Sequence, residues 1–306
     1  MKILLTGASG QLGRALQTQL SGERYQQIEL FAPIRAQMDL TDPQSIQRTL
    51  DDFQPDLIVN PAAYTAVDLA ESEPQAAFLV NTAAPALLAK EAKSRNIGLV
   101  HFSTDYVFDG SKRDTQGALV AYTEKDAPCP INIYGQSKLE GEIAIRESGC
   151  KHLIFRTSWV YSLFGKNFLL TILRLAQERD QLSIVNDQFG VPNSAAWLAE
   201  SCIKILEQLG SSQNQEAWWK KNSGTYNLAL SGYTSWFGFT QEILHLATSS
   251  GRLQKKPNSV LGIPASQYPT PARRPSNSIL CNAKLADNFS LQIPSWQSAL
   301  AICLSN

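Results

Sequence analysis

ILLTGASGQLG, at residues 3–13, joins a short apolar run to three glycines and then to a helical pattern. The apolar run predicts a buried strand, and the spacing of Leu12, Leu16 and Leu20 predicts a helix over residues 11–20. Glycines at such a turn permit a tight bend, close approach of a pyrophosphate to the backbone and close packing of helix on strand, while free N–H groups at the helix N-terminus attract the anion. The pattern predicts a dinucleotide site that includes Gly7, Gly10, Gln11, Leu12 and Gly13.

Patterns typical of strands and helices alternate along roughly the next 150 residues. Strands are expected at residues 28–33, 56–60, 98–103 and 152–157, and helices at about 42–53 and 73–95. Such alternation implies parallel strands joined by right-handed crossovers, so the predicted fold class is α/β, with a Rossmann doubly wound parallel sheet.

The alternation weakens after about residue 165. We therefore expect an NAD(P)-binding Rossmann domain at residues 1–165, to which a later strand or helix can return. Residues 166–306 are expected to form mainly a smaller C-terminal α/β substrate-binding lobe.

Composition narrows the class of partner. The chain of 306 residues has 27 basic and 27 acidic side chains, so no overall charge draws it to nucleic acid or to a membrane surface. Its five cysteines lack the CxxC spacing of a zinc site, and their odd number argues against a disulfide framework. No segment reads as a signal peptide or a membrane span. We expect a cytoplasmic protein.

The end of the second predicted strand bears on cofactor choice. The acid that grips the ribose of NAD in many Rossmann domains is missing from residues 31–35. Arg35 is able to pair with a 2′-phosphate instead, which favours NADPH and leaves NADH possible. A solvated surface arginine is the alternative interpretation of Arg35.

Tyr134 and Lys138 form the candidate catalytic pair. Their spacing of four places them on one face of a helix, about one turn apart. Hydride reduction of a ketone needs a proton donor, and a tyrosine serves better when a nearby cation stabilises its phenolate. Ser103 and Thr104 follow a predicted core strand at the sheet edge where ligands collect, and Thr104 is the expected hydrogen-bonding partner of the carbonyl oxygen.

Several longer motifs resemble those of one family, the dTDP-4-dehydrorhamnose reductases of the extended short-chain dehydrogenase/reductase superfamily. The motifs are STDYVFDG at 103–110, YGQSK at 134–138, RTSWVY at 156–161, NPAAYTAVD at 60–68, DQFGVP at 187–192 and RPSNS at 274–278. The resemblance covers nearly the whole chain.

The resemblance implies reduction of the 4-keto group of dTDP-4-dehydro-6-deoxy-L-mannose to dTDP-L-rhamnose, with hydride from NADPH or NADH. Tyr134 would protonate the sugar oxygen, Thr104 would steady it, and Lys138 would also hold the nicotinamide ribose. Further cofactor-binding residues implied by the resemblance are Asp39, Leu40, Ala62, Ala63, Tyr64, Thr65 and Ser103. Further substrate-binding residues are Val67, Asp105, Trp159 and Arg274.

Related functions remain as alternatives. Dehydratases of nucleotide sugars resemble one another in an Asp-Glu pair after the strand-end threonine, whereas Tyr106 follows Asp105 here. A 4-epimerase uses the same Tyr and Lys, and the non-catalytic regulatory subunit of methionine adenosyltransferase shares the motifs. Arg274 suits either substrate phosphates or a carboxylate that bridges the lobes.

The chain departs from the family at a metal site. Some members bind a divalent metal at a dimer interface through acidic residues, and the corresponding positions here are Ala15, Ala196 and Gln297. We therefore predict no metal, and a monomer or a homodimer without a metal bridge. The three histidines, His101, His152 and His245, are expected to be satisfied or solvated side chains and not ligands.

Overall fold

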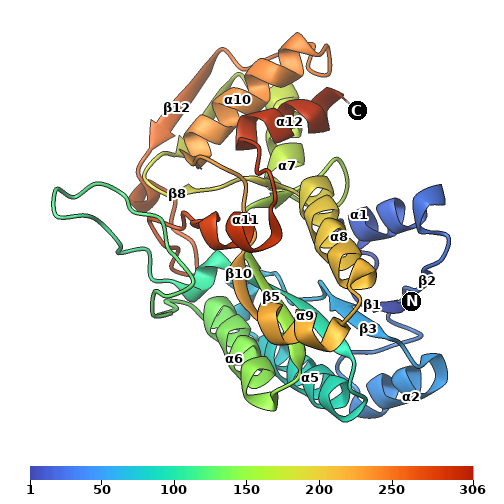
Figure 1. The fold of residues 1–306 in the computed structure, drawn as a ribbon. Helices are drawn as coiled ribbons and strands as arrows, with labels where there is room; N and C mark the ends of the chain where they lie inside the picture. Colours follow the sequence, from blue (N-terminus) through green and yellow to red (C-terminus); the bar gives the residue numbers. More distant parts are fainter. Residues whose placement is uncertain (306) are drawn as a thin grey trace.

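The computed structural model describes residues 1–305, and its centre is a six-stranded sheet in which every pairing is parallel (Figure 1). The strand order is β10-β5-β4-β3-β1-β2. The bounds are β1 Lys2–Leu5, β2 Glu29–Phe31, β3 Leu57–Asn60, β4 Gly98–Thr104, β5 Lys151–Thr157 and β10 Gly224–Asn227. The order changes direction beside β1, since β2 lies on one side of β1 and β3 on the other. This arrangement confirms the predicted doubly wound Rossmann sheet.

Alternation along β1 explains why both faces of the sheet are covered. Ile3 and Leu5 pack into the core cluster that includes α1 (Gln11–Leu20) and α8 (Ala195–Ser211). Leu4, between them, points into the opposite cluster with α2 (Pro43–Phe53) and α5 (Ala84–Ser94). Successive side chains of a strand point to opposite faces, so an apolar run with helices on both sides is buried throughout.

Side-chain caps mark the starts of two helices that flank the sheet, α2 and α6 (Ile133–Ser148). Asp42 accepts a hydrogen bond from the backbone N–H of Gln44 and begins α2, with Pro43 as its first residue. Asn132 caps α6 by accepting from the N–H of Gly135 at 2.7 Å. The second cap fixes where the helix bearing Tyr134 and Lys138 begins.

The single helix expected at residues 73–95 is divided in the structure. It consists of α4 (Pro74–Phe78), a wider π-type turn η2 (Leu79–Ala83) and α5. Pro85 lacks an N–H and cannot donate to the carbonyl of Asn81, which weakens the regular ladder at this point. Gly141 of α6 has no side chain to block the Asn81 carbonyl, so the two helices approach closely there.

The second lobe has its own core and small pairs of strands (upper part of Figure 1). Helices α7 (Phe168–Glu178), α10 (Trp236–Ser249) and α12 (Trp296–Ser305) surround this core. The pairs are β7 (Gln181–Val185) with β12 (Ser259–Ile263), β8 (Phe189–Gly190) with β11 (Thr234–Ser235), and β6 (Val160–Tyr161) with β9 (Asn193–Ser194). The remaining elements are η1 Glu23–Tyr25, α3 Val67–Ala70, η3 Asp105–Val107, α9 Gln215–Asn222, η4 Ala265–Gln267 and α11 Ala283–Phe289.

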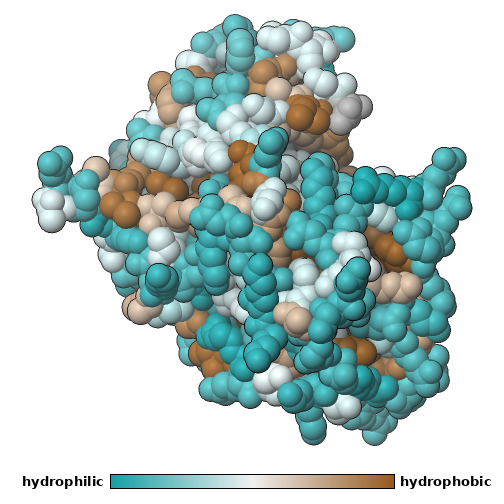
Figure 2. Space-filling view, in the orientation of Figure 1, coloured by the Kyte–Doolittle hydropathy of each residue, from teal (hydrophilic) through white to brown (hydrophobic). Residues whose placement is uncertain are grey.

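The chain returns to the first unit after residue 165. β10 pairs with β5 at the edge of the central sheet, and α8 packs against α1. The boundary at 165/166 stays a prediction. Figure 2 shows a largely hydrophilic face with separate hydrophobic areas. Across residues 1–305, none of the helices is long and apolar enough to cross a membrane.

Candidate active site

The glycine loop lies at the carboxyl end of β1, and two of its glycines are required by close contacts. Gly7 has a φ of +60°, and a Cβ there would lie 2.8 Å from the backbone of Ala62. A Cβ on Gly13 would collide with the carbonyl oxygen of Gly7. The N–H of Gly10 donates to the Gly7 oxygen at 2.9 Å and closes the turn. The turn thus brings bare backbone to the N-terminus of α1, a shape that fits a dinucleotide pyrophosphate.

The segment after β3 forms the neighbouring wall. Ala62 and Ala63 lie beside Gly7, and Tyr64 follows them. The side chain of Asn81 accepts from the Tyr64 N–H at 2.8 Å and donates to the Tyr64 oxygen at 3.0 Å. Thr65 is exposed at the end of this segment. Sequence reasoning missed Asn81, although a polar residue on the buried face of a predicted helix was a usable signal.

Arg35 and Asp39 lie together beyond β2. The Arg35 guanidinium is largely exposed and lies 3.5 Å from the Asp39 carboxylate. Hydrogen bonds from Thr41 lower the pKa of Asp39. Leu40 is half-buried against the core on the α2 side of the sheet. The structure therefore brings these three predicted cofactor residues to one edge, where the Arg35 side chain is exposed to solvent.

Thr104, Asp105 and Tyr134 meet where β4 ends against α6. Thr104 is the last residue of β4, one beyond the expected end, and its Oγ1 donates to Asp105 Oδ1 at 2.9 Å. Burial raises the pKa of Tyr134 to about 12, and a hydrogen bond with Thr104 opposes that rise. The ring of Tyr106 meets the ring of Tyr134 edge-on, with centroids 5.5 Å apart. Two predicted catalytic groups, Thr104 and Tyr134, are thus in contact.

Lys138 lies one turn along α6 and is 1% exposed. Its Nζ donates to the Phe102 carbonyl at 2.7 Å and lies 3.2 Å from His101 Nε2. Burial lowers the pKa of Lys138 to about 8. In this structure burial and Thr104 act on the pKa of Tyr134, while the Lys138 amine donates to β4. A lowering of the Tyr134 pKa by Lys138 stays a prediction.

Asp105 provides a second titratable group beside Tyr134. Burial raises the pKa of Asp105 to about 6. Its Oδ2 is buried and finds no hydrogen-bond partner within residues 1–305. A buried carboxylate oxygen without a protein partner is a natural acceptor for a ligand hydroxyl. Ser103, which lies in β4 two residues before Asp105, is also buried.

Trp159 comes to the same region from the turn after β5. It adopts a φ of +45°, which only a few per cent of non-glycine residues do. Its indole stacks on Trp236 with centroids 3.4 Å apart, and a Cβ on Gly190 would lie 2.7 Å from the same indole. Neighbours from the second lobe therefore hold this side chain in place.

Arg274 and Val67 join the two lobes near Tyr106. Arg274 Nη2 lies 2.8 Å from Asp68 Oδ2, so the guanidinium contacts a carboxylate from the first lobe. Its Nε is buried and lacks a partner in the part of the chain that the structure describes. Val67, next to Asp68, packs with Tyr64 and Tyr106 around the cluster that contains Tyr134. The carboxylate-bridging alternative for Arg274 is the contact that the structure contains.

The positions that correspond to the metal site of some family members carry no acid. Ala15 is buried on α1, and Gln19 of the same helix donates to the Ala196 oxygen of α8 at 2.8 Å. Gln297 is on α12. Within residues 1–305 no three His, Cys, Asp or Glu side chains are grouped as metal ligands would be. The absence of a metal stays a prediction.

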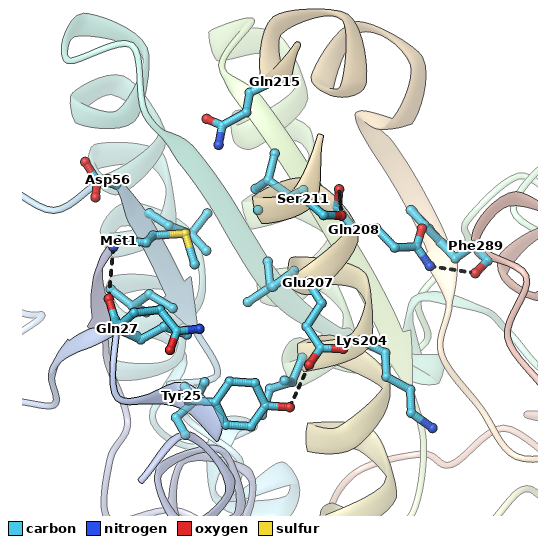
Figure 3. A pocket seen from close by; sticks show the side chains of 18 of the residues that line it. Met1, Tyr25, Gln27, Asp56, Lys204, Glu207, Gln208, Ser211, Gln215 and Phe289 are labelled. Atoms are coloured by element: carbon cyan, nitrogen blue, oxygen red, sulfur yellow. Dashed lines mark hydrogen bonds between the residues drawn. The ribbon is translucent and has the colours of Figure 1, made fainter. Parts of the chain in front are cut away.

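A wide groove lies elsewhere in the molecule. It measures about 1210 Å³ and lies at the amino ends of β1 and β3, between η1 and α8 (Figure 3). None of the predicted site residues lines it. Its polar groups bond within the chain, as Tyr25 does with Glu207 at 2.9 Å and Gln208 with the Phe289 oxygen at 2.8 Å. The volume of a groove alone therefore does not identify the place where the predicted catalytic residues meet.

A glycine-loop Rossmann sheet with a buried Tyr and Lys pair and a strand-end threonine defines the extended short-chain dehydrogenase/reductase class. A family described as "RmlD substrate binding domain" matches residues 1–306. The chain is 42% identical over 306 residues to dTDP-4-dehydrorhamnose reductase of Burkholderia thailandensis, covering 99% of this chain and 98% of the relative. It is 40% identical to the Escherichia coli K12 enzyme of that name, over 97% of this chain and 95% of the relative.

A solved structure gives the same result. The dTDP-4-dehydrorhamnose reductase of Bacillus anthracis, in complex with NADP, has a TM-score of 0.85 and 34% identity, covering 99% of this chain and 98% of that one. The chain belongs to the dTDP-4-dehydrorhamnose reductase family, a family of oxidoreductases, as its motifs predicted.

Proposed function

We propose that this protein reduces the 4-keto group of dTDP-4-dehydro-6-deoxy-L-mannose (dTDP-4-dehydro-β-L-rhamnose) to give dTDP-L-rhamnose, in nucleotide-sugar and cell-surface polysaccharide biosynthesis. The reductant is NADPH, with NADH as a possible substitute. The observation that carries the proposal is that buried Thr104 and Tyr134 lie together where β4 ends, at the same edge of the parallel sheet as the glycine loop. Family membership supports the substrate.

A nicotinamide cofactor bound here would supply a hydride to the carbonyl carbon of the sugar. Gly7, Gly10, Gln11, Leu12 and Gly13 would hold the pyrophosphate at the N-terminus of α1. Arg35, Asp39 and Leu40 would contact the adenosine end. Ala62, Ala63, Tyr64 and Thr65 would form the wall beside the loop, and Ser103 with Lys138 would face the nicotinamide half.

Tyr134 is the proposed proton donor. Because its pKa is about 12, the phenol is protonated at neutral pH and holds the proton that the sugar oxygen needs. Thr104, whose hydroxyl donates to Asp105 and acts on the pKa of Tyr134, would orient this proton toward the substrate. Burial of all three side chains excludes water and strengthens these hydrogen bonds.

The sugar would be oriented from two sides. Asp105 Oδ2 would accept from a sugar hydroxyl, because that oxygen is the unpartnered acceptor beside Tyr134. Trp159 would pack against the sugar ring from the second lobe, and Val67 would contact the substrate from the first. Arg274, bridged to Asp68, would close this edge and offer its free Nε to the substrate.

The test is a coupled assay with products of a dTDP-glucose dehydratase and epimerase, run beside the corresponding UDP-linked sugars. We expect NADPH consumption with the dTDP-linked sugar. Product formation without NADPH consumption would indicate a 4-epimerase, and no turnover of either sugar would favour a binding subunit.

The assembly is proposed to be a monomer or a homodimer without a metal bridge, located in the cytoplasm. The five cysteines are free thiols, in keeping with a reducing compartment. Scattering mass and activity should stay the same in a chelator, and a strong loss of either would overturn this part of the proposal.

A further inference from the structure

A buried chain of side chains connects β1 to the amine of Lys138. Thr6 Oγ1 donates to Asn60 Oδ1 at 2.6 Å, and Asn60 Nδ2 lies 3.0 Å from His101 Nδ1. On the other side of the imidazole, His101 Nε2 lies 3.2 Å from Lys138 Nζ. Asn60 and His101 are fully or almost fully buried, and Thr6 is 2% exposed. Water therefore contributes little to this chain, and its members satisfy one another.

The direction of the hydrogen bonds decides which nitrogen of His101 carries the proton. The amide oxygen of Asn60 is taken by the Thr6 hydroxyl, so Asn60 presents its NH2 group to His101. Nδ1 must then accept, and a neutral imidazole with an accepting Nδ1 has its single N–H at Nε2. That N–H faces Lys138, whose nitrogen is able to accept a hydrogen bond only as the uncharged amine.

We propose that Thr6, Asn60 and His101 form a positioning chain that stabilises the uncharged amine of Lys138, so that this lysine readily releases its proton. The proposal rests on the proposed function, because it assigns the chain a part in the proton supply of that reaction. His101 is a positioning residue, since it acts through Lys138.

Burial acts in the same direction as the chain. It lowers the pKa of Lys138 to about 8 and holds the pKa of His101 well below its usual value, so the imidazole stays neutral. The charged group that opposes this is Glu142, one turn further along α6, which raises the pKa of Lys138. Its carboxylate is committed to Arg156 of β5 at 2.9 and 2.6 Å.

Other titratable groups near Lys138 lie on α6, α3 and η3. Arg146 of α6 also pairs with Glu142, at 3.0 Å. Asp68 of α3 pairs with Arg274, and Glu71, at its C-terminal cap, accepts from the N–H of Ile133. On η3, burial raises the pKa of Asp105 to about 6 and moves that of Tyr106 above its usual value.

The inferred proton relay starts at Tyr134 and ends at solvent. The Tyr134 O–H bond breaks as its proton passes to the sugar oxygen, whose carbon receives the hydride from the reduced nicotinamide. The phenolate regains a proton from the Lys138 ammonium, and the amine that remains is the form that the His101 N–H stabilises. Solvent then returns a proton to Lys138. A lysine with a pKa near neutrality supplies this proton more readily than an ordinary one.

The test measures the pKa of Lys138 by NMR titration of its ε-carbon, with the signal identified by its loss in Lys138→Met. Thr6→Val removes the hydroxyl that fixes Asn60, and Thr6→Ser is the matched control that keeps it. With Thr6→Val, Asn60 is free to turn its oxygen to His101, Nε2 becomes an acceptor, and the ammonium is stabilised. We expect the pKa of Lys138 to rise by about one unit, because one unit corresponds to about the net free energy of one hydrogen bond. In Thr6→Ser the pKa of Lys138 should be unchanged.

His101→Met gives a second measurement, because it removes the N–H donor while keeping a side chain of similar length. We expect the pKa of Lys138 to rise, and the alkaline limb of kcat/KM to move to higher pH with it. An unchanged or lower pKa in both Thr6→Val and His101→Met overturns the proposal. If His101→Met fails to fold, the Thr6 pair decides alone.

The NMR titration needs neither substrate nor cofactor, so it separates this inference from the proposed function. A raised pKa without turnover of the dTDP-sugar would support the chain and count against the reductase. Normal turnover with an unmoved pKa would support the reductase and overturn the chain.

Discussion

The two ends of the central sheet differ in how their polar groups are satisfied. At the amino end, the groove of Figure 3 measures about 1210 Å³, and Tyr25, Glu207 and Gln208 in it bond within the chain. At the carboxyl end, Asp105 Oδ2 and Arg274 Nε are buried and lack a partner among residues 1–305. Buried polar atoms are nearly always paired in native proteins, so a ligand bound at this end would satisfy both atoms.

The titratable groups follow the same division. Burial moves the pKa of Tyr134 to about 12, that of Lys138 to about 8 and that of Asp105 to about 6. At the groove, Tyr25 also has a raised pKa, but its hydroxyl is held by Glu207. Perturbed groups gathered around a sheet edge where ligands bind are a better guide to function than volume.

The largest expected effect comes from replacing one tyrosine at each end of the sheet. Tyr134→Phe removes the proposed proton donor and should lower the rate of NADPH oxidation with the dTDP-sugar by roughly a hundredfold or more. Tyr25→Phe removes a hydroxyl at the opposite end and should leave the rate unchanged. Circular dichroism and thermal melting would show that both variants fold. An unchanged rate in Tyr134→Phe would remove Tyr134 from the mechanism.

The next effect concerns the glycine loop. Gly7→Ala places a Cβ against Ala62 at a φ of +60°, so the loop must shift. We expect cofactor binding to weaken about tenfold or more, since a left-handed backbone costs an alanine on the order of 1–2 kcal/mol. Gly210→Ala, whose Cβ would meet nothing within 4 Å, is the control at the groove. Fluorescence titration with NADPH measures both, and equal affinities would show that the loop does not bind the pyrophosphate.

Asp105 allows a test of how burial affects stability. Its pKa of about 6 is above the ordinary value of 3.8, so the folded state binds the proton more tightly than the unfolded state. Stability therefore falls as pH rises from about 4 to 6, and the loss persists at neutral pH. Asp105→Asn should melt at a higher temperature than the unaltered protein at pH 7 and at nearly the same temperature at pH 4. An equal difference at both pH values would mean that ionisation is not the cause.

The smallest expected effect is on cofactor choice. Arg35 is largely exposed and already paired with Asp39, so its interaction with a 2′-phosphate is screened. Arg35→Ala should raise the KM for NADPH by less than about tenfold and leave that for NADH in place, since an exposed ion pair contributes about 1 kcal/mol or less. Equal changes for both cofactors would make Arg35 a surface residue only.

Periodicity predicted the fold well where local pattern is dominant. The strand predicted from the apolar run at β1, the helix expected at about 42–53 and the helix that places Tyr134 and Lys138 on one face each depend on neighbours in sequence. The structure contains all three elements. The division of the helix at 73–95 was missed because it depends on Pro85 and on the close approach of Gly141, contacts made in three dimensions.

Chemistry at the site was predicted in part. Motif and strand position singled out Thr104 and Tyr134, and the two side chains lie together in the structure; their catalytic roles stay predictions. The partners of Lys138 were not foreseen, because His101 and Asn60 come from two different strands and only the register Asn60↔His101 makes them neighbours. The stacking of Trp236 on Trp159 likewise joins residues far apart in the chain.

Transfer of deuterium from NADPH labelled at C4 of its nicotinamide is the most direct test of the central claim, that the Thr104 and Tyr134 site reduces a sugar ketone. With the dTDP-4-dehydro sugar and the labelled cofactor of the reactive face, mass spectrometry and NMR should find one deuterium at C4 of the product sugar, with one NADPH oxidised per sugar. A product without deuterium at C4, or no oxidation of NADPH, would contradict the account.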